Sequence, residues 1–259
     1  MLCFMNIRKE LRRVWLGVGG SALLAAAFFA PYVQAGDAPR AVVELFTSQG
    51  CSSCPPADRL MGELAKNPQY VAMSWPVDYW DYMGWKDTLA SPLFTGRQKA
   101  YAEARGDGQI YTPQAVIDGL THVVGSDSGA IQSAGTALQG QHGALSVAMT
   151  LSETPNGLHV MVAGATAESG TSASLWLLHI TKSKAVAIGR GENSGHTVTY
   201  TNVVRAFAKI GDWTGAPASY TIPAAQLKAP DAEGYVLLLQ AGAPTSPGVI
   251  LAAAKSANL

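Results

Sequence analysis

The sequence has 259 residues, of which 48% are hydrophobic and 14% are charged, and lysine plus arginine equal aspartate plus glutamate at 18 each. Beyond the first 35 positions the basic residues are scattered, which argues against a nucleic-acid or anionic-membrane partner, because both need a clustered basic surface. The length and aliphatic content suffice for one large hydrophobic core or two smaller ones.

The first 35 residues have the pattern of a cleaved export signal. A basic stretch at 8–13 precedes an apolar run at 14–29, and small residues surround Ala35, after which signal peptidase would cut. An uncleaved membrane anchor is the alternative, but glycine and serine interrupt the run, which is also short for a membrane span. The sequence therefore predicts a signal peptide over 1–35, a periplasmic or secreted protein, and no stable membrane span after cleavage.

Two cysteines, Cys51 and Cys54, follow this signal, whereas Cys3 lies within it. An oxidising compartment would allow the pair to cycle as a disulfide. No third cysteine would then compete for pairing.

The cysteine pair lies at a predicted strand-to-helix turn. Residues 41–46 are a short apolar run typical of a buried strand, and helical spacing of apolar residues begins after Pro55. Backbone N–H groups at a helix N-terminus stabilise an anion, so an exposed Cys51 is predicted to ionise readily and to act as the attacking thiolate. Cys54, about one helical turn further on, is predicted to resolve the mixed disulfide.

The next segment predicts a strand at 70–77 and a helix at 92–105, separated by an aromatic stretch at 78–85. The aromatic rings could form a hydrophobic substrate wall beside the cysteines. Packing over the core is the preferred interpretation, because clustered aromatic residues more often pack than bind.

Residues 111–124 predict a hairpin in which Pro113 stands at the entry to an apolar strand. Ser126 or Asp127 can cap a closing helix. The predicted order of elements over 40–141 is therefore strand, helix, strand, helix, strand, strand, helix.

Five blocks of the sequence carry a family resemblance: 44–58, which contains the cysteine pair, and 77–85, 111–114, 191–195 and 202–205. Together they resemble a secreted thioredoxin-like family catalogued as domain of unknown function 1223, over about 40–255. This resemblance implies a thioredoxin-like fold and redox chemistry, but no known substrate.

The resemblance also implies a cis bond before Pro113, with the proline lying against the cysteine pair. Since an isolated X-Pro bond is cis in only about 5–6% of cases, this prediction rests on the combination with the cysteines. The predicted site residues are Cys51, Cys54, Thr112 and Pro113, with no cofactor and no metal.

The C-terminal part predicts β-structure. Residues 145–152 alternate between apolar and polar, and a Pro-Asn-Gly turn at 155–157 leads into a second strand. Further short strands are predicted at 174–180, 185–189, 196–200, 219–222, 235–240 and 249–254. Strands at this spacing suggest a sandwich. The predicted fold class is therefore an α/β thioredoxin-like domain over 40–141 followed by a mostly β, sandwich-like domain over 144–256.

Other polar residues give weaker signals. A polar turn could form a ligand site facing the cysteines, but a turn that satisfies its own backbone is preferred; it contains Glu192, Asn193, Ser194 and His196. The five histidines lack the paired spacing of metal ligands.

Glu44 could lie beneath the cysteine pair, where burial would raise its pKa, and accept a proton from Cys54. A solvated strand face is the preferred interpretation of Glu44.

Three classes of function remain. The preferred one is a thiol-disulfide oxidoreductase that acts on an exported protein or on a small thiol or disulfide, with attack by Cys51 and resolution by Cys54. A thiolate metal-binding module is less favoured, because a CxxC pair supplies only two ligands. The third is a non-catalytic interaction protein with a structural disulfide. A redox-labile disulfide, a bound metal, or a disulfide resistant to mild reductant would distinguish the three.

Overall fold

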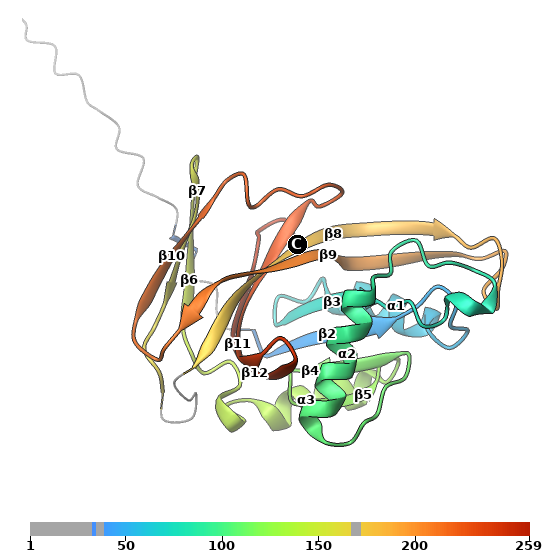
Figure 1. The fold of residues 1–259 in the computed structure, drawn as a ribbon, viewed down its shortest axis with the longest axis horizontal. Coiled ribbons are helices and arrows are strands. Elements are labelled where there is room, and N and C mark those ends of the chain that lie inside the picture. The colour runs from blue at the N-terminus through green and yellow to red at the C-terminus, as the bar shows by residue number, and fades with distance from the viewer. Residues whose placement is uncertain (1–32, 35–38, 167–171) are drawn as a thin grey trace, which may run out of the picture. The chain divides into compact units, whose positions relative to one another are not determined.

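The computed structural model describes residues 33–34, 39–166 and 172–259 (Figure 1). Apart from Val33–Gln34, the predicted signal peptide lies outside the described residues. No helix in the described ranges has the length and apolar character needed to cross a membrane.

The described residues are mostly β. The helices are α1 (Pro55–Leu64), α2 (Pro92–Arg105) and α3 (Ser128–Leu138), with short 3-10 turns η1 (Asp81–Met83) and η2 (Gln141–Gly143). The strands are β1 (Val33–Gln34), β2 (Ala41–Thr47), β3 (Tyr70–Pro76), β4 (Gln114–Ile117), β5 (Thr121–Val124), β6 (Met149–Thr154), β7 (Gly157–Val162), β8 (Ala173–Ala187), β9 (Thr197–Trp213), β10 (Ala218–Pro223), β11 (Gly234–Ala243) and β12 (Ser246–Lys255).

The principal sheet has eight strands in the order β12-β11-β8-β9-β3-β2-β4-β5. It therefore combines strands from both predicted domains, and the junction is a parallel pairing of β3 with β9 at Ser74 and Val203. Side chains strengthen this junction, because Ser74 Oγ donates to Thr201 O at 2.9 Å and Asn202 Nδ2 donates to Ala72 O at 3.0 Å.

The predicted fold class is wrong. The structure is not an α/β thioredoxin-like domain followed by a β domain, because one mixed sheet runs through both segments. The physical reason lies in β9, which covers the edge of β3 that would otherwise carry unpaired backbone groups. The predicted strands 174–180 and 185–189 are also one continuous strand, β8.

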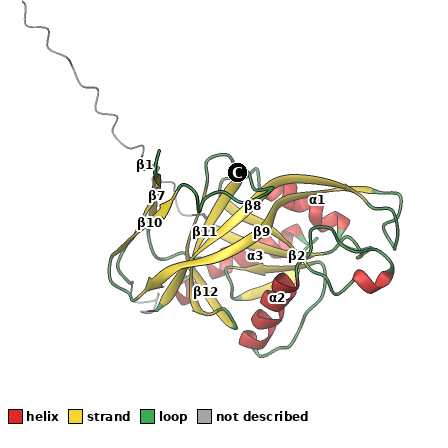
Figure 2. Cartoon of the chain, turned by 45° about the horizontal axis from the view of Figure 1, so that its top comes forward, coloured by secondary structure: helices red, strands yellow, loops and turns green. Residues whose placement is uncertain are grey.

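The order of elements predicted for 40–141 is confirmed, since β2, α1, β3, α2, β4, β5 and α3 follow one another. Alternation along β2 explains its burial on both faces. Val43 and Leu45 pack with α1 and α3, whereas Val42 and Phe46 pack with α2. Figure 2 shows α1, α2 and α3, in red, on the same side of the molecule as β2.

A second sheet, β1-β6-β7-β10, packs on the C-terminal half of the principal sheet. Apolar side chains from β6, β7 and β10 meet those of β8, β11 and β12 in a common core. Two packed β-layers are thus present in the C-terminal segment, but one layer belongs to the sheet that also contains β2 to β5.

Candidate functional site

Cys51 and Cys54 form a disulfide at the start of α1. Cys54 precedes the helix and Pro55 takes its first position, where the missing N–H of proline costs no helical hydrogen bond. The predicted strand-to-helix placement is confirmed. The predicted exposure of Cys51 is wrong, because only 1% of Cys51 and 0% of Cys54 is accessible.

The Sγ atom of Cys51 has two polar neighbours. Ser53 Oγ lies at 3.4 Å and the carbonyl oxygen of Thr112 at 3.7 Å. The Thr112–Pro113 peptide bond is cis, as predicted. Thr112 therefore lies against Cys51, and Pro113 is the buried residue that follows it.

The aromatic stretch before α2 reaches the same segment. Trp80 Nε1 donates to Thr112 Oγ1 at 2.8 Å. Trp80 and Tyr79 pack against the core, in line with the preferred interpretation of this stretch. Tyr82 differs, since it stacks on Trp80 with ring centroids 6.4 Å apart and is 77% exposed. An exposed aromatic surface thus continues outward from Thr112.

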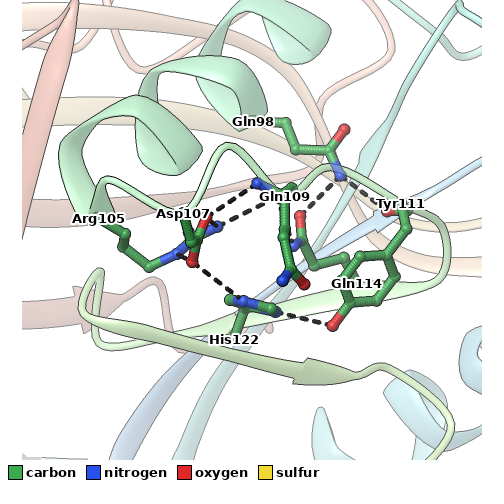
Figure 3. A network of polar contacts seen from close by, with 7 residues as sticks. All are labelled: Gln98, Arg105, Asp107, Gln109, Tyr111, Gln114 and His122. Carbon is green, nitrogen blue, oxygen red and sulfur yellow. Dashed lines mark hydrogen bonds and ion pairs between the residues drawn. The ribbon is translucent and has the colours of Figure 1, made fainter.

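A polar network holds the chain that leads to Thr112 (Figure 3); it comprises Gln98, Arg105, Asp107, Gln109, Tyr111, Gln114 and His122. Gln98 of α2 donates to Tyr111 O and Gln114 Oε1, both at 2.8 Å. His122 of β5 contacts the Tyr111 hydroxyl at 2.8 Å. The segment before Pro113 is therefore held by both α2 and β5.

Asp58 is a buried carboxyl one helical turn beyond Cys54. Its backbone N–H donates to Cys54 O at 3.1 Å, and residues four apart share one face of a helix. Thr47 Oγ1 donates to Asp58 Oδ1 at 2.8 Å, but Oδ2 has no hydrogen-bond partner. Burial raises the pKa of Asp58 to about 8. The sequence reasoning missed Asp58, although its spacing from Cys54 was a usable signal.

Residues 188–196 form the loop that joins β8 to β9, and we call this loop the hairpin tip. It contacts residues 49–54, which contain the disulfide and which we call the cysteine turn. Asn193 Nδ2 donates to the carbonyl oxygens of Gln49 and Cys51, both at 2.9 Å. Glu192 Oε2 accepts a hydrogen bond from the Ser52 N–H at 3.2 Å. Two residues of the predicted polar turn therefore contact the cysteine turn.

The hairpin tip also satisfies part of its own backbone. Ser194 N donates to Gly191 O at 3.1 Å, and His196 N donates to Asn193 O at 3.2 Å. The interpretation as a self-satisfied turn is therefore only part of the arrangement. What it missed is the contact with residues about 140 positions earlier, which no local pattern could indicate.

Glu44 does not lie on a solvated strand face, so that preferred interpretation is wrong. It is fully buried, and Arg97 of α2 pairs with it at 2.8 Å (Nε to Oε1) and 3.1 Å (Nη2 to Oε2). Tyr101 OH donates to the same carboxylate at 2.5 Å. Both carboxylate oxygens are therefore occupied on the α2 face of β2, and we do not retain Glu44 as a proton acceptor for Cys54.

Residues 33–34, 39–166 and 172–259 contain no group of three or more histidine, cysteine, aspartate or glutamate residues placed to hold a metal ion.

Comparison with known proteins identifies the family. Residues 42–240 match the model of a protein family of unknown function, DUF1223. The chain belongs to the DUF1223 family. Membership of DUF1223, predicted from the five sequence blocks, is thus confirmed, whereas the match does not bear on a secreted or thioredoxin-like character. No curated protein matches the chain.

Two solved structures are similar to this DUF1223 protein. The first is the crystal structure of a protein from Agrobacterium tumefaciens, whose sequence is 32% identical to this chain and whose fold matches with a TM-score of 0.75. The match covers 85% of this chain and 94% of that one. HBP35 of Porphyromonas gingivalis is 10% identical, with a TM-score of 0.51, and the match covers 85% of this chain and 75% of that one. The second likeness concerns the fold alone.

Four of the five blocks that resemble DUF1223 proteins meet around the disulfide. The cysteine turn itself contacts Thr112 from one block, and Glu192 and Asn193 from another. Trp80, from a third block, bonds to Thr112. Residues 202–205 lie in β9, where Val203 pairs with β3. Segments distant in sequence therefore converge on Cys51 and Cys54.

Proposed function

We propose that this protein exchanges thiols and disulfides through Cys51 and Cys54. The observation that carries the proposal is the position of the disulfide at the N-terminus of α1, where the helix dipole stabilises a thiolate. The Ser53 hydroxyl, whose Oγ lies 3.4 Å from Cys51 Sγ, can also donate a hydrogen bond to that thiolate.

The size of the loop also favours exchange over a structural role. The two cysteines are only three positions apart. A disulfide stabilises a fold chiefly by restricting the unfolded chain, and this effect is smallest for short loops. The Cys51–Cys54 bond therefore adds little to the stability of the fold, and its reduction during exchange would cost little stability.

In the proposed reaction a thiolate of the partner attacks Cys51 Sγ. A mixed disulfide forms between the partner and Cys51, the Cys51–Cys54 bond breaks, and its electron pair stays on Cys54, which then takes a proton. A second partner thiolate attacks the mixed disulfide and releases Cys51 as a thiolate. The partner dithiol is thereby oxidised, and the cysteine pair is reduced; the reverse sequence reduces a partner disulfide.

Cys51 is the better candidate for the attacked sulfur. Both cysteines are buried, but Cys51 Sγ lies beside Ser53, which is exposed, and Thr112, which is half-buried. The proposed partner is an exported protein or a small thiol or disulfide, in the oxidising compartment that the signal pattern predicts.

Trapping the mixed disulfide tests this assignment. The Cys54→Ala protein, incubated with oxidised glutathione, is expected to gain one glutathione adduct on Cys51, because the resolving thiol is absent. Mass spectrometry of the intact protein and of its peptides measures the adduct and its position. The matched Cys51→Ala protein is expected to react at least about tenfold more slowly, since Ser53 Oγ, which would stabilise a thiolate, lies next to Cys51 Sγ.

The alternative of a non-catalytic protein with a structural disulfide is favoured by the burial of both sulfur atoms. If Cys54→Ala gains no adduct under conditions that modify free cysteine, or if the two variants react equally, the proposed exchange at Cys51 is wrong.

A further inference from the structure

The hairpin tip stands on a ribbon that leaves the principal sheet. β11 pairs with β8 only as far as Ile180, whereas β8 and β9 remain paired with each other up to Ala187 and Thr197. The two strands therefore continue as a two-stranded extension beyond β11, and the hairpin tip is its end.

The extension is held in two ways. Apolar packing reaches the first residue of the hairpin tip, because Ile188 is buried in a small cluster with Leu89, Val198, Tyr200 and Val203. The contacts of the hairpin tip with the cysteine turn are instead polar, and they come from Glu192 and Asn193. Displacing Glu192 and Asn193 would therefore break their three hydrogen bonds to the cysteine turn and leave Ile188 in the apolar cluster.

Asn193 constrains the backbone of the cysteine turn. Its side chain is buried, and both of its amide hydrogen bonds end on carbonyl oxygens, those of Gln49 and Cys51, which flank Gly50. Loss of the amide would leave two buried carbonyls with fewer partners and would free the turn to move.

Glu192 acts on the same turn through charge. Its carboxylate accepts from the N–H of Ser52, the residue that follows Cys51 in the turn before α1. A carboxylate at this amide opposes a second negative charge on the neighbouring Cys51 sulfur.

Two other acidic groups lie near the turn. Asp58 packs one helical turn beyond Cys54, and Asp87 accepts from the Gln49 N–H at 2.8 Å. Burial raises the pKa of both, to about 8 for Asp58. Of the three acidic groups, Glu192 is the exposed one that contacts the turn directly.

We infer that the hairpin tip is part of the reaction centre: Glu192 and Asn193 are positioning residues that hold the cysteine turn closed and restrain the reactivity of Cys51. The inference rests on the proposed exchange at this pair. A protein-sized partner then reaches Cys51 only after the tip is displaced, whereas a small thiol needs less displacement. The tip thereby selects for small partners over large ones.

The thiol pKa of Cys51 tests the charge effect without any substrate. It is read from the pH dependence of the alkylation rate in the Cys54→Ala background. Glu192→Gln is expected to lower this pKa by about 0.2–0.7 units, the range for one charge at a helix terminus. Glu63→Gln, an exposed change at the other end of α1, is the matched control and is expected to leave the pKa unchanged. An unchanged pKa in Glu192→Gln overturns the charge effect.

The rate of disulfide reduction tests the closure. Asn193→Ala, in the otherwise wild-type protein, is expected to speed reduction by a protein dithiol severalfold more than reduction by dithiothreitol. Equal acceleration of both reductants, or none, overturns the selection by size. Since Asn193 is buried, thermal unfolding is recorded alongside, and Glu192→Gln supplies a second variant with an exposed site.

These outcomes differ from a failure of the proposed function. If Cys54→Ala forms no glutathione adduct but Glu192→Gln still shifts the thiol pKa, exchange fails and the charge effect stands. If the adduct forms and the tip variants change neither the pKa nor the rates, exchange stands and the inference about the tip fails.

Discussion

Replacing Arg97 with methionine is expected to lower the free energy of unfolding by about 3–5 kcal/mol, the usual cost of removing one partner from a buried ion pair. The change leaves the Glu44 carboxylate buried without its cation. It also removes a hydrogen bond to Tyr101 OH at 2.8 Å and one to Gln240 Oε1 at 3.0 Å. Urea unfolding of the two proteins measures the difference.

The double variant Glu44→Gln with Arg97→Met is expected to lose less stability than Arg97→Met alone, because no unpaired charge remains buried. Lys209→Met is the matched control, since it breaks an exposed ion pair with Asp212, and no measurable loss is expected. A loss for Arg97→Met no larger than that for Lys209→Met would show that the buried pair does not stabilise the fold.

Replacing Asp58 with asparagine is expected to change how stability depends on pH. The pKa of Asp58 is raised from 3.8 to about 8 by burial. Between these values the folded protein holds a proton that the unfolded chain has released, so stability falls as pH rises, by about 1.4 kcal/mol per pH unit. The asparagine side chain does not titrate, so the variant loses this contribution. Chemical unfolding at intervals from pH 4 to pH 9 measures the slope of stability against pH.

The relevant comparison is between slopes, because other groups titrate in both proteins. Asp118, whose pKa burial raises to about 7, has the same sign and is unchanged in the variant. Glu63→Gln, on the exposed part of α1, is expected to leave the slope as in the wild type. If Asp58→Asn and the wild type have parallel stability profiles from pH 4 to pH 8, then Asp58 is not protonated in the folded protein over that range.

Local patterns predicted the parts of the site that depend on neighbours in sequence. The cysteine pair lies between β2 and α1 because an apolar strand run is followed by prolines and helical spacing. The cis bond at Pro113 followed from the family resemblance and not from the proline alone. Asp127 caps α3 through a hydrogen bond from Ala130 N at 2.9 Å, as one of the two predicted caps.

The rest depends on contacts between distant segments. β9 has 17 residues, and its pairing with β3 joins segments that composition assigned to separate domains. The polar run Thr-Lys-Ser-Lys at 181–184 separated the two short strands predicted in place of β8, but β8 continues through this run, paired with β9 at Ser183 and Lys184. Burial of Cys51 was likewise unpredictable from its own neighbours, because the hairpin tip that contacts its turn is about 140 residues away.

The proposed exchange requires that the Cys51–Cys54 disulfide is labile. The wild-type protein is equilibrated with mixtures of reduced and oxidised glutathione, and the oxidised fraction is measured by alkylation and mass spectrometry. We predict a reversible transition with a reduction potential roughly between −270 and −120 mV, the range of known exchange proteins. A pair that stays oxidised in every mixture, with a potential below about −300 mV, would contradict the proposed exchange and indicate a structural disulfide.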